Sequence, residues 1–327
     1  MKVLVTGAAG FFGSNLCEYL LENGHQVVGV DNFNNFYPPK IKEYHIRDFA
    51  QHPGFKLYRD DILDIEGLAK IFDRESPFDG IVHLAAWAGI TYSIEKPAIY
   101  VRNNIEGTVN VADLAVKHKI NNLVFASSSS VYGTNPTPFH EDMKINDPLA
   151  PYPATKRGAE LILQTYSKNF GLNVTVTRIF NPTAPRMRPD LVLPKLIRSV
   201  EYGQGFPLYW TPGELQKTGR DYCYIGHMLD AIQKILSSPF RFEIVNLGNS
   251  SPVTLGELIG SVEEVTGKKV KIEQLPKRKG EMLLTYANID KARDLLGYNP
   301  TTTIKEAIKM YHDWYLKQED WYRRGSF

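Results

Sequence analysis

Tyr152 and Lys156, in the stretch PYPATKRGAE, are the pair of residues whose types and spacing point most directly to chemistry. They lie four residues apart at the start of an expected helix, so their side chains share one face of it. An ammonium group beside a phenol stabilises the phenolate, which can then act as a base near neutral pH. The pair therefore predicts proton transfer at a substrate hydroxyl, and a chance pair on an amphipathic helix is the alternative.

A run of four serines, in ASSSSVYG over residues 126–133, directly follows the apolar segment 123–125. Such a run is unusual at the end of a buried strand. One explanation is a polar turn whose hydroxyl groups satisfy nearby backbone groups. The other is that one hydroxyl faces a substrate while its neighbours decide which chemistry can occur there.

The stretch VTGAAGFFGSNL places Gly7, Gly10 and Gly13 between the first expected strand and the first expected helix. Glycine lets the backbone approach a pyrophosphate closely, and a helix N-terminus favours its negative charge. Asp31 ends the second expected strand, where a carboxylate can bind a ribose 2′-hydroxyl and repel a 2′-phosphate. No basic residue follows it directly in DNFNNF, so the pattern favours NAD over NADP. For the glycine-rich loop the alternative is a tight turn, and for Asp31 it is a solvated strand end.

These residues need a scaffold, and the first half of the chain alternates short β-branched segments with amphipathic ones. We expect strands at 2–6, 26–31, 55–59, 80–84, 121–126 and 173–180, and helices at 14–22, 66–72, 100–118 and 152–170. This alternation predicts an α/β fold with a Rossmann-type, doubly wound parallel sheet. Two more strand ends fit its cofactor crevice: Asp61 and Ile62 could meet an adenine, and His83–Ala86 offer small residues beside a ribose.

The alternation breaks at Asn181 and Pro182, and residues 181–220 are rich in proline and glycine. Two short apolar segments, 243–247 and 269–274, and terminal helices follow. We therefore expect residues 1–180, with about 221–245, to form a nucleotide-binding domain. Residues 181–220 and 246–327 would form a smaller C-terminal α/β substrate domain.

The composition excludes several classes of protein. The 327 residues carry a net charge of +2, which gives no reason to expect a nucleic-acid partner. Two cysteines argue against a disulfide framework and fit a cytoplasmic protein. Met1 leads straight into KVLVTGAAG, so no signal peptide is expected, and no apolar run is long enough to span a membrane. The scattered histidines predict no metal site.

Taken together, the motifs resemble those of the extended short-chain dehydrogenase/reductase superfamily, in its nucleotide-sugar epimerase/dehydratase branch. The resemblance rests on TGAAGFFGS, VDNFNNFY, VHLAAWAG, NNIEGTVN, FASSSSVYG, YPATK, RPD, GRDYCYI and VNLGNSSPV, which run through nearly the whole chain. Within that branch the motifs are most similar to those of UDP-glucuronate 4-epimerases. The resemblance implies a Rossmann domain with tightly held NAD, a smaller domain that binds a UDP-sugar, and a homodimer formed through helices 100–118 and 152–169.

The resemblance also assigns roles to residues. Tyr152 would be the base, Lys156 its partner, and Ser128 the hydroxyl that bonds the reacting sugar hydroxyl. The cofactor-binding residues implied are Gly7, Gly10, Phe11, Phe12, Gly13, Asp31, Asn32, Asp61, Ile62, Leu84, Ala85, Ala86, Asn104, Ser127, Tyr152 and Lys156. The substrate-binding residues implied are Ser128, Ser129, Ser130, Tyr152, Asn181, Arg188, Arg220, Arg278 and Glu281. For the basic run that holds Arg278, a solvated turn is the simpler alternative.

The resemblance suggests what the serine run excludes. Related 4,6-dehydratases carry an acidic pair directly after the catalytic Ser or Thr, and UDP-glucuronate decarboxylases carry Glu at the second of those positions. Here both positions, Ser129 and Ser130, hold neutral hydroxyls that cannot perform those steps. The implied reaction is inversion at C4 of a UDP-sugar through a transient 4-keto intermediate, with UDP-glucuronate converted to UDP-galacturonate.

Two departures from the family pattern bear on the substrate. The family usually has Arg where this chain has Thr91, and RIFNPTAP, with Asn181 and Pro182, is similar to the pattern of UDP-glucose 4-epimerases. Arg188 is retained and, with Ser129 and Ser130, is the candidate group for a sugar carboxylate. The alternatives are a UDP-glucose or UDP-N-acetylglucosamine 4-epimerase, a UDP-glucuronate decarboxylase, an NAD-dependent reductase, and a catalytically silent dinucleotide-binding protein.

Overall fold

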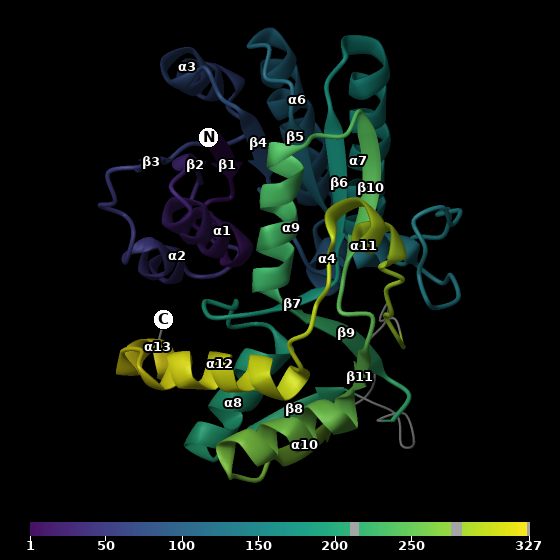
Figure 1. Ribbon diagram of the computed structural model, residues 1–327. Coiled ribbons are helices and arrows are strands. Elements are labelled where there is room, and N and C mark those ends of the chain that lie inside the picture. Colours follow the sequence, from purple (N-terminus) through teal and green to yellow (C-terminus); the bar gives the residue numbers. More distant parts are fainter. Residues whose placement is uncertain (210–215, 276–282, 326–327) are drawn as a thin grey trace. The chain divides into compact units, whose positions relative to one another are not determined.

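The computed structural model describes residues 1–209, 216–275 and 283–325, and within them the chain divides into two compact units. Unit 1 comprises Met1–Asn135, Glu141–Ile179 and Leu229–Asn246, and unit 2 comprises Pro136–His140, Phe180–Met228 and Leu247–Phe327. The stretch 221–228 belongs to unit 2, although its sequence position suggested the nucleotide-binding domain. Figure 1 labels the elements of both units.

Unit 1 is built on a sheet whose seven described strands follow the order β10-β6-β5-β4-β1-β2-β3. The strands are β1 (Lys2–Thr6), β2 (Gln26–Val30), β3 (Phe55–Tyr58), β4 (Gly80–His83), β5 (Leu123–Ser128), β6 (Val174–Ile179) and β10 (Phe242–Leu247). Strands β1 to β6 run parallel to their neighbours in the sheet. The predicted doubly wound parallel sheet is confirmed, and the expected strands match within a few residues.

The helices of this unit are α1 (Phe11–Glu22), α2 (Pro39–Ile46), α3 (Ile65–Glu75), α4 (Ile90–Glu95), α5 (Pro97–Val101), α6 (Gly107–Lys117) and α7 (Pro151–Phe170). Helix α9 (Ile225–Ser237) begins in unit 2 and ends in unit 1. The prediction of one helix over 100–118 was wrong in detail, because a π-helical turn, Arg102–Glu106, separates α5 from α6. The Thr108 hydroxyl, at the start of α6, donates to the carbonyl of Asn104 in this turn at 2.7 Å.

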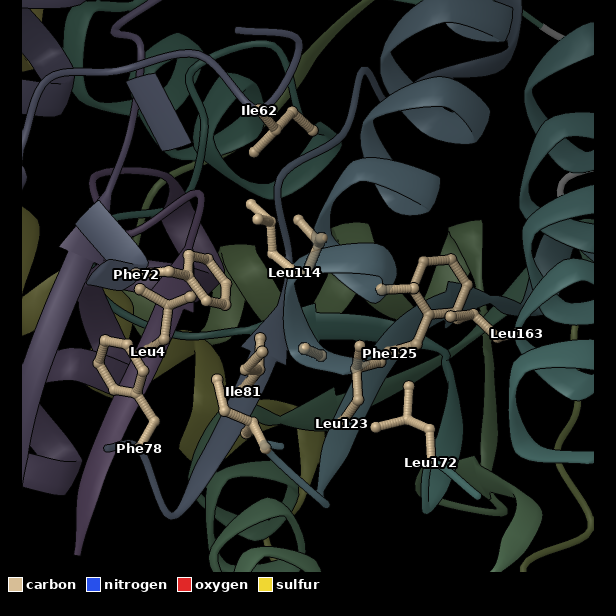
Figure 2. Close-up of a cluster of buried hydrophobic side chains, with 14 of the residues drawn as sticks. Leu4, Ile62, Phe72, Phe78, Ile81, Leu114, Leu123, Phe125, Leu163 and Leu172 are labelled. Atoms are coloured by element: carbon tan, nitrogen blue, oxygen red, sulfur yellow. The ribbon is translucent and has the colours of Figure 1, made fainter. Parts of the chain in front are cut away.

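An apolar core fixes α7 against the sheet. Leu4, Ile81, Leu123 and Phe125 on the strands form one buried cluster with Phe72 on α3, Leu114 on α6 and Leu163 on α7 (Figure 2). Helices α3, α6 and α7 therefore cover the same face of the sheet. Each fully buried side chain of this size contributes about 1.5–3 kcal/mol relative to an exposed one. This packing sets the position of the residues at the N-terminal end of α7.

Unit 2 contains two small sheets among its described residues. Strands β7 (Asn181–Thr183), β9 (Gly219–Tyr224) and β11 (Pro252–Thr254) form one in the order β11-β9-β7, and β8 (Gly205–Tyr209) pairs with β12 (Lys271–Leu275) in the other. Its helices are α8 (Val192–Tyr202), α10 (Leu255–Thr266), α11 (Asp290–Leu296), α12 (Ile304–Leu316) and α13 (Asp320–Arg324). Among the helices described in either unit, none has the length and apolar character that crossing a membrane requires.

Candidate active site

The glycine-rich loop of unit 1 is packed too closely for side chains. Gly7 has a φ of +71°, and a Cβ atom on it would lie 2.9 Å from the backbone nitrogen of Ala85. A Cβ atom on Gly13 would lie 2.0 Å from the carbonyl oxygen of Gly7. Helix α1 begins at Phe11, so its first N–H groups, including those of Phe11 and Phe12, lack partners within the helix. Such a helix N-terminus suits a pyrophosphate, and the loop fits the predicted dinucleotide.

Asp31 is buried at the carboxyl end of β2 and is held by three groups. Its carboxylate accepts hydrogen bonds from the N–H groups of Ala9 at 3.0 Å and Phe33 at 2.8 Å. The third group is Lys42 on α2, whose Nζ lies 3.7 Å from Asp31 Oδ1. Burial lowers the pKa of Lys42, and Asp31 opposes this shift. Sequence reasoning missed Lys42, because it lies eleven positions beyond Asp31 on a helix that had not been predicted.

The next strand ends meet at the same edge of the sheet. Asn32 donates to Asp61 Oδ2 at 2.8 Å, which joins the ends of β2 and β3. Ile62 differs from its predicted neighbours, because its side chain belongs to the apolar core and packs against Gly107. The backbone N–H groups of Leu84 and Ala85 donate to Thr6, and the small side chain of Ala86 follows them.

Asn104, at the π-helical turn, is buried and connects two parts of the site. Its Oδ1 accepts the N–H of Trp87 at 2.8 Å, and its Nδ2 donates to the carbonyl of Trp87 and to Thr155 Oγ1, both at 3.0 Å. The amide thus joins the segment after β4 to the first turns of α7. Single π-helical turns occur frequently at functional sites, and this one presents Asn104 to both partners.

The serine run lies where β5 ends and a 3₁₀ turn, Ser129–Tyr132, begins. Ser128 accepts hydrogen bonds from the N–H of Ser130 at 3.2 Å and from its hydroxyl at 2.9 Å. The hydroxyl of Ser127 donates to Glu160 Oε1 on α7 at 2.5 Å. Local satisfaction of backbone groups therefore accounts for part of the run, and Ser128 through Ser130 form a turn of neutral hydroxyls.

Lys156 is buried on α7, one helical turn after the half-buried Tyr152. Its Nζ donates to the carbonyl of Ala126 at 2.7 Å and lies 4.8 Å from the ring centroid of Phe125. Burial lowers the pKa of Lys156 to about 7, and the charge of Glu160 opposes the shift. The edge of Tyr100 meets the ring of Tyr152, with centroids 6.1 Å apart. A base candidate and a cation thus share one face of the helix.

His83, at the end of β4, is an uncharged neighbour of this pair. It is buried, and its ring nitrogens are within hydrogen-bond distance of Thr6 Oγ1 (2.7 Å) and Thr108 Oγ1 (3.0 Å). Burial, together with the charge of Lys156, lowers the pKa of His83 to about 3. His83 therefore stays neutral at physiological pH and adds no charge beside Lys156.

The remaining predicted residues lie in unit 2. Arg220 on β9 donates from Nη1 to the carbonyls of Gly219 at 2.8 Å and Leu283 at 3.2 Å. Asn181 on β7 pairs in register with Tyr222 on the same sheet. Beside Arg220, the buried Asp221 accepts N–H groups of Asn249, Ser250 and Ala287, although burial raises its pKa to about 6. Predicted residues Arg278 and Glu281 lie outside the described residues.

Arg188 already has an acidic partner. Its Nε and Nη2 donate to the two carboxylate oxygens of Asp190, each at 3.0 Å, in a bidentate pair. The Arg188 side chain is 17% exposed and that of Asp190 47% exposed. A sugar carboxylate would therefore have to compete with Asp190 for this guanidinium.

The family described as GDP-mannose 4,6 dehydratase matches residues 4–311 of this chain. The chain belongs to this family. Within it, a UDP-glucuronate 4-epimerase of Thermodesulfobacterium geofontis is 37% identical over 95% of this chain and 95% of the relative. The resemblance to the nucleotide-sugar epimerase/dehydratase branch is confirmed.

Two solved structures of sugar-nucleotide epimerases are similar in fold to this chain. The UDP-glucuronic acid 4-epimerase of Bacillus cereus, in complex with UDP-glucuronic acid and NAD, has a TM-score of 0.89 at 32% identity and covers 96% of this chain and 98% of its own. The UDP-glucose 4-epimerase of Thermotoga maritima, with UDP-glucose, has a TM-score of 0.87 at 27% identity and covers 97% and 99%. The fold is thus shared by epimerases of an acidic sugar and of a neutral one.

Proposed function

We propose that this chain is an NAD-dependent UDP-sugar 4-epimerase that converts UDP-glucuronate to UDP-galacturonate. The observation that carries the proposal is the pairing of Tyr152 and Lys156 on α7 with a turn that offers only neutral hydroxyls, Ser128 to Ser130. The pair suits proton transfer at a sugar hydroxyl. The neutral turn lacks the acid and base that dehydration would need. The relatives named for UDP-glucuronate support the acidic sugar.

The residues of unit 1 suit reversible oxidation at C4. Tyr152, as a phenolate stabilised by the Lys156 ammonium, removes the proton of the sugar 4-hydroxyl, and Ser128 hydrogen-bonds the same oxygen. The chemistry that NAD supplies when bound is reversible acceptance of the C4 hydride. The resulting 4-keto sugar turns to present its other face, and Tyr152 then returns the proton. Lys156 is suited to its role because its Nζ is buried and held by a hydrogen bond to the carbonyl of Ala126.

We propose that NAD is held by the predicted set in unit 1, apart from Ser127, whose hydroxyl is engaged by Glu160. The glycine loop and the start of α1 would bind the pyrophosphate, and Asp31 would bind the adenosine ribose. Asn104 would act through Trp87 and Thr155, because its amide is engaged by them. Lys42 pairs with Asp31 and would help to hold that carboxylate in place.

The residues of unit 2 that would bind the substrate are proposed from the charges of their side chains. Arg220 would bind the diphosphate, since a guanidinium offers several N–H donors to phosphate oxygens. Arg278 and Glu281 would bind the uridine nucleotide. Arg188, with Ser129 and Ser130 of unit 1, would bind the sugar carboxylate after exchanging its Asp190 partner. Holding that carboxylate matters, because the 4-keto form of a uronate is a β-keto acid that loses CO2 readily.

We further propose a homodimer formed through α5, α6 and α7.

Product analysis by NMR tests the proposal. The purified protein is incubated separately with UDP-glucuronate, UDP-glucose and UDP-N-acetylglucosamine, without added cofactor. We expect UDP-galacturonate from UDP-glucuronate and NAD in the denatured protein. Turnover of the neutral sugars alone would favour the alternative that Asn181 and Pro182 suggest, and a UDP-pentose as the main product would identify a decarboxylase.

A further inference from the structure

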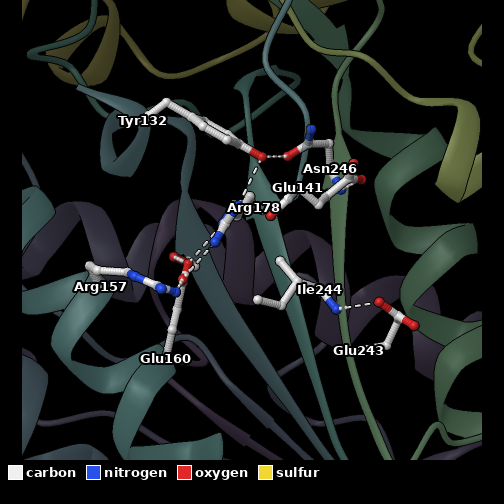
Figure 3. A network of polar contacts seen from close by, with 9 residues as sticks. Tyr132, Glu141, Arg157, Glu160, Arg178, Glu243, Ile244 and Asn246 are labelled. Atoms are coloured by element: carbon white, nitrogen blue, oxygen red, sulfur yellow. Dashed lines mark hydrogen bonds and ion pairs between the residues drawn. The ribbon is translucent and has the colours of Figure 1, made fainter. Parts of the chain in front are cut away.

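A buried network of charged and polar groups lies beside the proposed catalytic residues, and the reaction as proposed does not use it. Glu160 on α7 and Arg178 on β6 are at its centre, with side chains 0% and 1% exposed. Arg178 donates from Nη2 to Glu160 Oε2 at 2.9 Å and from Nε to Oε1 at 3.1 Å. Figure 3 shows the two side chains facing each other between their elements. The pair joins the catalytic helix to the sheet.

One end of the serine turn is attached to the carboxylate of this pair. The hydroxyl of Ser127, directly before Ser128, donates to Glu160 Oε1 at 2.5 Å. Arg157 adds a further donor to Glu160 Oε2 at 2.8 Å. Hydrogen bonds to an ionised group are stronger than neutral ones. Ser127, near the end of β5, is therefore held at a fixed position relative to α7.

The other end of the turn is attached to the guanidinium. Tyr132 ends the 3₁₀ turn, and its hydroxyl accepts a hydrogen bond from Arg178 Nη1 at 3.0 Å. The same hydroxyl donates to Asn246 Oδ1 on β10 at 2.6 Å (Figure 3). The Tyr132 ring also lies over the guanidinium, with its centroid 4.8 Å from Cζ. Both ends of the serine turn are thus attached to the two members of one ion pair.

We propose that Ser127, Glu160, Arg178 and Tyr132 form a two-ended clamp that positions the Ser128–Ser130 turn for proton transfer to Tyr152. The inference rests on the proposed function. Tyr152, Lys156 and Glu160 follow one another at intervals of four residues, so they lie on one face of α7. The helix that presents the base therefore also holds the turn that presents the sugar-binding hydroxyl. Glu160 and Arg178 are positioning residues, because they act through Ser127 and Tyr132.

The energetics of buried ion pairs favour a positioning role for Glu160 and Arg178 over a purely stabilising one. A buried ion pair is often no more stabilising than well-packed apolar residues of the same volume. Its geometry, however, is strict, because each donor and acceptor must meet its partner. A displacement of about 1 Å at reacting groups can reduce the rate by about 10²-fold. Fixing the turn at both ends limits displacements of this size.

The test loosens each end of the turn with small changes that leave the ion pair intact. Ser127→Ala removes the bond to Glu160, and Tyr132→Phe removes the hydroxyl between Arg178 and Asn246. We expect each single variant to lower kcat about tenfold and the double variant about 10²-fold, the scale expected for a 1 Å misplacement. The KM for the UDP-sugar and the amount of bound NAD should stay within about twofold. Unchanged NAD content separates the clamp from a direct contact of Ser127 with the cofactor.

Matched controls lie further along the same helix. The hydroxyl of Ser167 donates to the carbonyl of Arg241 at 2.7 Å, and that of Tyr166 donates to Asp113. Ser167→Ala and Tyr166→Phe therefore remove comparable hydrogen bonds from α7 without touching the serine turn. We expect a similar loss of thermal stability and a kcat within about twofold of the parent protein.

Hydrogen exchange gives a measurement that does not depend on turnover. Amides of residues 126–133 should exchange faster in the double variant than in the parent or the double control. If the parent protein turns over no UDP-sugar, the proposed function fails, and the clamp is then judged by exchange alone. Equal exchange in the double variant and the double control overturns the clamp, as does a kcat for the double variant within twofold of the control.

Discussion

Lys156 and Glu160 are one helical turn apart on α7, and both are buried, yet their surroundings differ. Glu160 accepts hydrogen bonds from Ser127 and from the guanidinium groups of Arg157 and Arg178. Lys156 donates to the neutral carbonyl of Ala126 and lies beside the ring of Phe125. One buried charge is surrounded by partners of opposite charge, and the other meets a carbonyl and a ring.

The pKa shifts follow this difference. Burial alone would raise the pKa of Glu160, but the hydrogen bonds and charge of Arg178 outweigh it, and the pKa is lowered. Burial lowers the pKa of Lys156 to about 7, and Glu160 compensates only in part. A buried charge with full partners maintains the architecture, whereas one without them costs stability and is typical of a functional site. Substitutions at the two positions should therefore have opposite effects on the free energy of unfolding.

The largest expected effect is on turnover at the Tyr152 and Lys156 pair. Tyr152→Phe removes the proposed base while keeping the ring that packs against Tyr100. Steady-state kinetics should show a loss of at least about 10²–10⁴-fold in kcat, the usual contribution of general acid–base catalysis. Bound NAD and the thermal midpoint should barely change. A variant with near-normal kcat would mean that another group is the base.

Glu160→Gln should reduce stability as well as loosen the serine turn, because it leaves the buried Arg178 without its full charge partner. Breaking a buried pair costs about 3–5 kcal/mol. Urea unfolding at pH 7 measures this loss, and Glu264→Gln, which removes an exposed partner of Lys305, is the control. A loss no larger than that of the control would show that the buried pair is not a structural requirement.

Lys156→Met should have the reverse effect on stability, with a more stable fold once bound NAD has been removed, and should also lose activity. The folded-state pKa of about 7 lies below the unfolded value of about 10.4, so between these pH values the unfolded chain binds the extra proton. The parent protein should therefore gain stability as pH rises through this window, on the order of 1 kcal/mol per pH unit from this group. The variant lacks that gain, so its advantage should be largest near pH 7 and shrink toward pH 10. An advantage independent of pH would contradict the assignment.

Sequence reasoning could predict the catalytic pair on α7 but not the partners that surround Glu160. Tyr152, Lys156 and the helix around them were predictable, because the helix over 151–170 has a regular pattern and the pair has a chemical spacing. The ion pair of Glu160 and Arg178 could not be predicted. One residue lies on a helix and the other on a strand, and their separation in the sequence matches no regular pattern. Lys42 was missed for the same reason. The predicted helix over 100–118 contains a π-helical turn at Arg102–Glu106, which the residue pattern of that segment did not indicate.

The smallest expected effect concerns the partly exposed pair of Arg188 and Asp190. If Arg188 binds the sugar carboxylate, Asp190→Asn removes its competitor and lowers the KM for UDP-glucuronate. Exposed ion pairs contribute about 0.2–1 kcal/mol, so the change should be at most about fivefold. The KM for UDP-glucose, if that sugar is turned over, is the control. An equal change for both sugars would remove Arg188 from the carboxylate site.

The central claim is that the sugar is oxidised reversibly at C4 without net redox change, with Tyr152 and Lys156 moving the proton and NAD accepting the hydride. The most direct measurement uses UDP-glucuronate carrying deuterium at C4, incubated with the protein in ordinary water and followed by NMR. The account predicts UDP-galacturonate that keeps the deuterium at C4, because the hydride leaves and returns within the same site. Product with hydrogen from water at C4, or a product that has lost CO2 in place of UDP-galacturonate, would contradict it.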